Sequence, residues 1–125
     1  MNFLLDTHTL ISTLENNTKL SENVRGAIIN GENMIFVSSA SAWEISIKKA
    51  TRTLQTSDNL YQEIKLHRFT ELKINFEHAQ LAGQLPSIHK DPFDRILIAQ
   101  AMIEKLTLIT RDKLIAQYDV SCLIA

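Results

Sequence analysis

The sequence predicts an α/β domain in which helices cover both faces of a mainly parallel sheet. Short apolar runs of strand length alternate with segments whose apolar residues recur every three or four positions, which is the spacing of one helix face. The 125 residues contain no linker rich in Pro, Gly or Ser and no internal repeat, so we expect one domain over residues 1–125. With 45% hydrophobic and 22% charged residues, the chain has enough apolar surface for a packed core.

Local patterns predict the first elements. Residues 2–5 form an apolar run that predicts a strand, and residues 7–15 have the periodicity of a helix. Residues 21–30 predict a second helix that stops before Gly31, and residues 34–37 predict a buried strand.

The helix after the second predicted strand can begin at Ser38 or Ser39, whose hydroxyls suit a helix N-terminus. Its apolar residues recur at intervals of three and four, namely Ala40, Trp43, Ile47 and Ala50. We therefore expect this face, including Trp43, to pack in the core and not to stack on bases.

The second half of the chain continues the alternation. Its expected elements are a helix at residues 60–64, a strand at 69–74, a short helix at 75–81, a loop at 85–90, a strand at 107–109, a short helix at 111–117 and an edge strand at 120–123. Asp91 followed by Pro92 marks a further helix start, because Asp caps exposed amides and Pro suits the first helical position. That helix should run to about Glu104.

Charge and apolar patterning exclude several classes of protein. The formal net charge of -1 excludes binding of nucleic acid by a general basic excess, so any such contact must be local. Local basic groups occur at Lys48, Lys49 and Arg52 and at His89, Lys90 and Arg95. No apolar run approaches the ~18 residues of a membrane-spanning helix. Residues 1–6 lack a secretory pattern and the single cysteine, Cys122, cannot form an internal disulfide, so we expect a cytoplasmic protein.

Four acids stand near predicted strand ends, namely Asp6, Glu44, Asp94 and Asp112. Ligand sites of open α/β sheets form beyond the carboxyl ends of the strands, so we expect these side chains in one crevice. Their mutual repulsion favours a hard divalent cation such as Mg²⁺. A metal of this kind can lower the pKa of its water, orient a phosphate and stabilise a leaving oxygen, as phosphodiester hydrolysis requires.

Each acid, taken alone, also has a purely structural interpretation. Asp6 and Asp91 can cap the helices that follow them, and Glu44 can pair with Lys48 four residues later. Asp112 can complement the positive end of the last helix. The four acids favour a metal site only when they are considered together.

Other polar side chains beside the acids are candidates to hydrogen-bond them or to contact a substrate: Thr7, His8, Ser38, Arg95 and Thr110. Histidines such as His8 and His89 serve more often as local hydrogen-bonding groups. The four histidines and one cysteine lack the spacing of a zinc site, and no GxxxxGK stretch of a P-loop exists.

Four segments together resemble the PIN-domain ribonucleases, specifically the VapC-like toxins of type II toxin-antitoxin systems. They are LLDTHTLI at residues 4–11, SSASAWEISIKK at 38–49, HKDPFDRILIAQA at 89–101 and TLITRDKLIAQYDV at 107–120. The resemblance implies a three-layer α/β/α fold with a central, mainly parallel sheet of four or five strands. It also implies Mg²⁺ or Mn²⁺ at the acids, endonucleolytic hydrolysis of RNA by metal-activated water, a cognate antitoxin that occupies the groove, and a homodimer.

Carried over to this chain, the resemblance makes Asp6 and Asp94 the principal metal ligands and adds Glu44 and Asp112. Asp91 belongs to the DPFD form of the motif and is a further candidate ligand. Ser12 departs from the pattern, because many relatives have tryptophan there, and the change bears on local packing or partner contacts.

Two alternatives remain at this point. The chain could be a catalytically inactive PIN-like module that binds RNA or protein. A phosphoryl-accepting receiver domain fits less well, because such domains have an acidic pair after the first strand and a lysine after the last, whereas Thr7 follows Asp6 and Arg111 follows Thr110. The acid motif does not specify which RNA is cut, because base choice depends on the shape of the groove.

Overall fold

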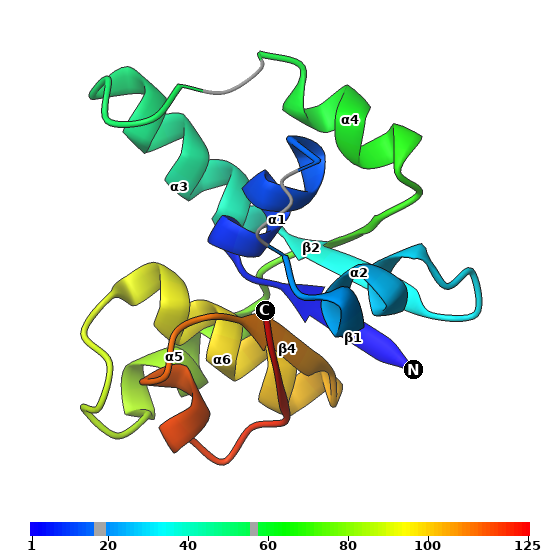
Figure 1. The fold of residues 1–125 in the computed structure, drawn as a ribbon. Helices are drawn as coiled ribbons and strands as arrows, with labels where there is room; N and C mark the ends of the chain where they lie inside the picture. Colours follow the sequence, from blue (N-terminus) through cyan, green and yellow to red (C-terminus); the bar gives the residue numbers. More distant parts are fainter. Residues whose placement is uncertain (17–19, 56–57) are drawn as a thin grey trace.

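A five-stranded parallel sheet forms the centre of the computed structural model, which describes residues 1–16, 20–55 and 58–125 (Figure 1). The strand order is β3-β2-β1-β4-β5, and every neighbouring pair is parallel. The strands are β1 (Asn2–Leu5), β2 (Met34–Ser38), β3 (Thr70–Leu72), β4 (Thr107–Thr110) and β5 (Cys122–Ile124).

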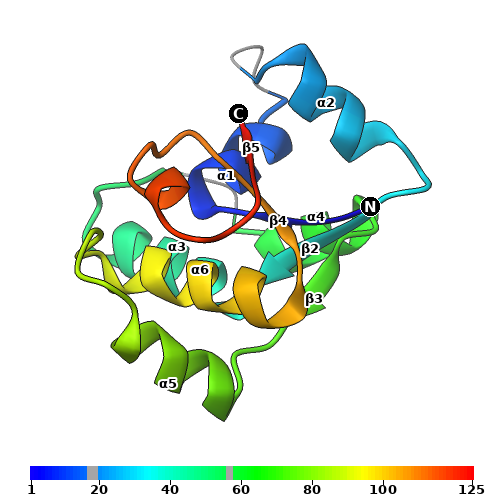
Figure 2. The ribbon, with the colours of Figure 1, turned by 90° about the horizontal axis from the view of Figure 1, so that it is seen from below.

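Helices lie on both sides of this sheet (Figure 2). They are α1 (Thr7–Leu14), α2 (Glu22–Ile29), α3 (Ser39–Ala50), α4 (Leu60–Leu66), α5 (Phe76–Gln84) and α6 (Pro92–Glu104), with a short 3₁₀ helix at Ile115–Gln117. α5 and α6 cover one face, whereas α1, α2 and α4 pack on the other. This arrangement confirms the predicted three-layer α/β/α fold.

Alternation along the strands creates two cores, one on each face of the sheet. In β1, Leu4 packs in the core beneath α5 and α6, whereas Phe3 and Leu5 pack in the core beneath α1 and α2. β4 repeats the pattern, with Leu108 on the first face and Ile109 on the second. Because successive strand side chains point to opposite faces, short apolar runs are buried from both sides.

The segment 111–117 was predicted to be a helix, but only Ile115–Gln117 adopts a single 3₁₀ turn. Two side chains hold the preceding residues in turns, because Thr110 Oγ1 accepts from the Asp112 amide at 3.0 Å and Asp112 Oδ1 accepts from the Leu114 amide at 2.9 Å. Such local side-chain bonds compete with helix formation. The strand expected at residues 69–74 is likewise shorter, at Thr70–Leu72.

Trp43 is exposed, and the prediction that it packs in the core was wrong. It is 61% exposed, Ile47 is 39% exposed, and Trp43 meets the Phe93 ring edge-on at a centroid distance of 5.2 Å. The buried residues of α3 are Ala40, Ser41, Glu44 and Ile45. Apolar periodicity indicated the wrong face because two of the buried positions carry polar side chains.

No described helix has the length and apolar character needed to cross a membrane. The helix starts are as the sequence indicated, since Ser38 Oγ accepts from the Ala40 amide at 3.0 Å and Asp91 caps α6. α2 ends at Asn30 in extended backbone, so Gly31 supplies no left-handed stop.

Replacing Lys105 by glycine should stabilise the fold by about 1 kcal/mol, because this exposed residue ends α6 in the left-handed region at φ 58° and ψ 48°, where a Cβ is strained. Urea unfolding measures the change. Lys105→Ala keeps the Cβ and serves as the control, so an equal gain in both variants would contradict this account.

Candidate active site

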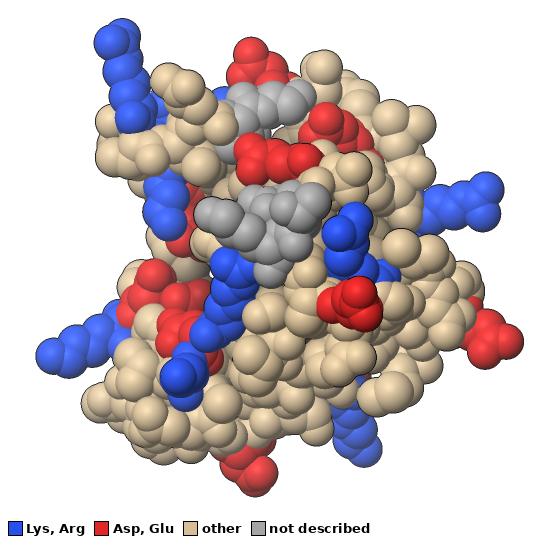
Figure 3. Space-filling model, viewed as in Figure 1, with Lys and Arg blue, Asp and Glu red and all other residues tan. Residues whose placement is uncertain are grey.

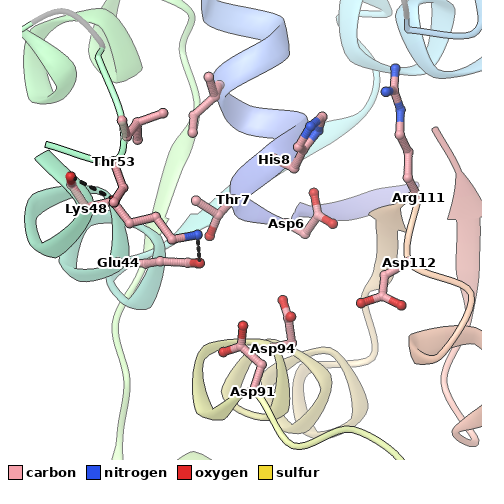
Figure 4. A pocket seen from close by; sticks show the side chains of 12 residues that line it. Asp6, Thr7, His8, Glu44, Lys48, Thr53, Asp91, Asp94, Arg111 and Asp112 are labelled. Atoms are coloured by element: carbon pink, nitrogen blue, oxygen red, sulfur yellow. Dashed lines mark hydrogen bonds and ion pairs between the residues drawn. The ribbon is translucent and has the colours of Figure 1, made fainter. Parts of the chain in front are cut away.

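A pocket of about 650 Å³ opens at the carboxyl ends of β1, β2 and β4. Figure 3 shows acidic and basic side chains side by side around a hollow on this face. Five acids line it, namely Asp6, Glu44, Asp91, Asp94 and Asp112, together with Lys48, Arg111, Thr7, His8, Ile11, Thr53 and Leu54. The structure therefore brings together all four predicted acids and Asp91. The acids point toward a common space from both sides of the pocket (Figure 4).

Asp6 is both a helix cap and a pocket residue. It follows β1 directly, is 6% exposed, and its Oδ1 accepts from the Thr9 amide at 2.8 Å at the start of α1. The backbone amide of Asp6 donates to the Ile109 carbonyl of β4 at 3.1 Å. The capping interpretation is thus correct, and it leaves the carboxylate at the pocket.

Glu44 is buried on α3 and forms the expected pair with Lys48, whose Nζ lies 2.8 Å from Glu44 Oε2. The hydrogen bond to Glu44 raises the pKa of Lys48, and the charges of Asp91 and Asp94 act in the same direction. Among the described atoms, Glu44 Oε1 is buried without a hydrogen-bond partner. A buried carboxylate oxygen without a partner is costly unless a cation or donor meets it.

The first turn of α6 presents two acids to the pocket. Asp91 Oδ1 accepts from the Phe93 amide at 2.9 Å and caps the helix. Burial raises the pKa of Asp94 to about 7, and the negative charge of Asp91 is the next contribution. The charges of Glu44 and Asp6 also raise this pKa, whereas His89 lowers it. The acids are therefore close enough to oppose one another's ionisation.

Asp112 and Asp94 meet at His89. The imidazole Nε2 lies 2.7 Å from Asp112 Oδ2 and 3.2 Å from Asp94 Oδ2. One ligand atom of each of these three residues lies within 4.8 Å of the other two, which is the one such group in the described part of the chain. Asp6 and Glu44 line the same pocket outside this tight group.

Of the other candidate residues, some line the pocket and others lie outside it. Thr7 lines the pocket and donates its hydroxyl to Ser41 at 3.0 Å, and the exposed His8 also lines it. Ser38 is buried at the start of α3 and does not line the pocket, as far as the described residues show. The hydroxyl oxygen of Thr110 accepts a hydrogen bond from the Asp112 amide.

Among the residues that the structure describes, Arg95 contacts no acid and does not line the pocket, in contrast to the prediction. Its guanidinium donates to backbone carbonyls at Ala82 (3.1 Å), Leu85 (2.8 Å), Pro86 (3.0 Å) and His89 (3.0 Å). It therefore binds the last turn of α5 and the loop before α6. The Arg95 guanidinium has five N–H donors, and these backbone carbonyls accept from it in place of the nearby carboxylates.

Sequence reasoning missed Lys48 and Arg111 as pocket residues, and it underrated His89. Lys48 is four residues from Glu44, so helical spacing already placed them on one face. Arg111 immediately precedes Asp112, which gave a similar signal. The bridging position of His89 depends on loop geometry and had no signal in the sequence.

The residues present fit a divalent cation. The donors are carboxylate oxygens, which Mg²⁺ and Mn²⁺ accept. The buried, unpartnered Oε1 of Glu44 and the raised pKa of Asp94 both mark a deficit of positive charge in the pocket. A cation there would compensate both.

The PIN domain family model matches residues 3–121 of this chain. A comparison with curated proteins finds no match.

Similar solved structures include DNA-bound VapBC from Salmonella typhimurium, with a TM-score of 0.67 and 19% identity, covering 99% of this chain and 98% of that chain. VapBC2 from Rickettsia felis, bound to a promoter DNA fragment, has a TM-score of 0.73 at 16% identity and covers 100% and 99%. FitAcB from Neisseria gonorrhoeae has a TM-score of 0.67 at 20% identity and covers 97% and 96%. At these identities the likeness concerns the fold.

We expect the metal-free protein to lose stability as pH rises from about 4 to above 7. The folded pKa of Asp94, about 7, lies above its ordinary value of 3.8, so this residue favours folding while it is protonated in both states. The contribution is lost between these two pKa values, because Asp94 ionises in the unfolded chain while it stays protonated in the folded protein. Asp94→Asn should therefore be more stable than the wild type at pH 8 by about 1–3 kcal/mol.

Urea unfolding in EDTA from pH 4 to pH 8 measures this difference, and exposed Asp119→Asn is the matched control. A difference between Asp94→Asn and the wild type that stays constant with pH would contradict the assignment.

Proposed function

The chain belongs to the PIN domain family, and on that premise we propose that it is a metal-dependent endoribonuclease that acts as the toxin of a toxin-antitoxin system. The observation that carries the proposal is the convergence of five carboxylates on one pocket, where Asp94 has a raised pKa and Glu44 Oε1 has no hydrogen-bond partner among the described residues. Helix caps and surface ion pairs could form just as well if these carboxylates pointed in different directions, so these structural roles do not explain the convergence.

In this proposal Asp6 and Asp94 are the principal metal ligands, and Glu44 and Asp112 complete the catalytic set. Asp91 is a further ligand candidate, because it lines the same pocket. A bound Mg²⁺ or Mn²⁺ ion supplies Lewis acidity toward water and the scissile phosphate, and it offsets the charge of the transition state. The fold holds one oxygen of Asp6 and of Asp91 through helix caps, which fixes the direction of each carboxylate.

RNA requires positive charge beside these acids. Lys48 and Arg111 line the pocket on opposite sides of the acid group, and a bound cation would add to them (Figure 4). Lys48 is half-exposed, so its ammonium can reach a phosphate while it stays next to Glu44. We therefore propose that Lys48 binds the RNA backbone next to the scissile bond.

The proposed partners are a cognate antitoxin, which occupies the groove, and a second copy of the chain. Similar solved structures include VapBC and FitAB, which this chain matches over nearly its whole length. We also propose that residues 1–125 act as a single domain in the cytoplasm, where the single Cys122 stays reduced.

Asp6→Asn or Asp94→Asn should reduce Mg²⁺- or Mn²⁺-dependent cleavage of RNA at least ~10³-fold, because loss of a ligand charge removes the cation. Both side chains keep their shape, so the fold should survive. Cleavage of total RNA by purified protein, with Asp119→Asn as control, measures the effect.

Variants that cut RNA as fast as the wild type would overturn the assignment. Mg²⁺ binding by a wild-type protein that cuts no RNA would favour the alternative, a catalytically inactive PIN-like binding module. Expression with and without the genomic neighbour, followed by mapping of new RNA 5′ ends, identifies the cleaved RNA and tests the antitoxin.

Lys48→Met should weaken binding of single-stranded RNA about tenfold, because one charge-assisted contact to phosphate is lost. The slope of log affinity against log salt should become shallower by about 0.7. Fluorescence anisotropy in an Asp6→Asn background measures both quantities without cleavage.

Lys73→Met removes the same charge from an exposed position that does not line the pocket, so it is the matched control. Equal weakening by both variants would show that Lys48 contributes only to the general charge.

A further inference from the structure

The His89 ring lies behind two of the pocket acids. Its Nε2 approaches Asp112 Oδ2 at 2.7 Å and Asp94 Oδ2 at 3.2 Å, and its side chain is 9% exposed. Both acids line the pocket, but His89 is not among the described residues that do so. The ring therefore contacts the carboxylates from the protein side.

The hydrogen bonds fix which ring nitrogen carries the proton. The Asp91 backbone amide donates to His89 Nδ1 at 3.1 Å. An amide N–H can only donate, so Nδ1 is an acceptor without hydrogen, and the ring is neutral with its hydrogen on Nε2. That N–H points at Asp112 Oδ2, and Asp94 Oδ2 lies 3.2 Å from the same nitrogen.

Hydrogen bonds also hold the backbone of His89. Its amide donates to the Tyr118 hydroxyl at 2.7 Å, and the hydroxyl in turn donates to the Pro86 carbonyl at 2.6 Å. Its carbonyl accepts from Arg95 Nη1 at 3.0 Å. The residues that bind this loop thus determine where Nε2 lies relative to the two acids.

This tautomer separates two roles for the histidine. To coordinate a cation, Nε2 would have to lose its hydrogen, and the neutral ring would then carry hydrogen on Nδ1, facing the Asp91 amide donor. His89 cannot be a metal ligand while that bond exists. As a hydrogen-bond donor, it can still hold the Asp112 carboxylate in place.

We propose that His89 is a positioning residue that holds the Asp112 carboxylate, next to Asp94, through its Nε2–H for cation binding, without coordinating the cation itself. The proposal rests on the proposed function, because it gives these two acids a metal-binding role. Ligating carboxylates are commonly held by such hydrogen bonds, and loss of the bond lowers metal affinity.

A matched pair of variants tests the donor. His89→Gln keeps an N–H group near the position of Nε2, whereas His89→Met has similar length and no donor. We expect Met to weaken Mg²⁺ binding about 10- to 100-fold in titration calorimetry, and Gln to stay close to the wild type. Circular dichroism verifies that both variants fold. Equal losses in both, or no loss with Met, would overturn the proposal.

NMR of protein with ¹⁵N-labelled histidine reads the tautomer directly. A neutral His89 ring with hydrogen on Nε2, both without and with saturating Mg²⁺, is expected. Hydrogen on Nδ1 in the Mg²⁺-loaded protein, or no Mg²⁺ binding by the wild type, would overturn the proposal.

Neither readout depends on RNA cleavage. Donor-dependent Mg²⁺ binding in a protein that cuts no RNA supports the role of His89 and refutes only the nuclease. Conversely, RNA cleavage by a protein whose His89→Met variant binds Mg²⁺ like the wild type refutes only the positioning role.

Discussion

The crowding of carboxylates at the carboxyl ends of parallel strands is the constraint on which the site depends. Negative charge that is partly removed from water must be protonated, paired with a cationic side chain or met by a metal ion. The pocket displays the first two responses, since Asp94 has its pKa raised to about 7 and Glu44 binds Lys48. Within the described part of the chain, Glu44 Oε1 has no hydrogen-bond partner, which shows that these responses are incomplete. Charge balance therefore links the fold to the proposed chemistry.

The sequence was sufficient to predict the layers and the meeting of the acids, because both depend on local rules. Short apolar runs such as residues 2–5 identified strands, and Asp91 with Pro92 identified the start of α6. Strand ends of a parallel sheet share one edge, so acids such as Asp6 and Asp112 could be expected together before any coordinates.

Other features depend on three-dimensional packing that no local rule contains. Trp43 was assigned to the core from apolar periodicity, and the assignment failed because Glu44 and Ser41, which are polar, occupy the buried face of α3. Arg95 was assigned to the acids by its position in sequence, but it donates to one carbonyl of α5 and to three carbonyls of the loop that follows. The bridge made by His89 arises from that same loop, so it could not be foreseen either.

Two acids both cap a helix and line the pocket, and this affects which substitutions relatives of this chain can accept. Asp6 and Asp91 each cap a helix while they line the pocket, so a lineage that abandoned chemistry would still need a hydrogen-bond acceptor at both positions. Glu44 and Asp94 cap none of the described helices. Because both are partly or fully buried, their negative charge lowers the stability of the fold when no cation is bound. Among homologues, drift at these two positions is therefore the more sensitive sign that activity has been lost.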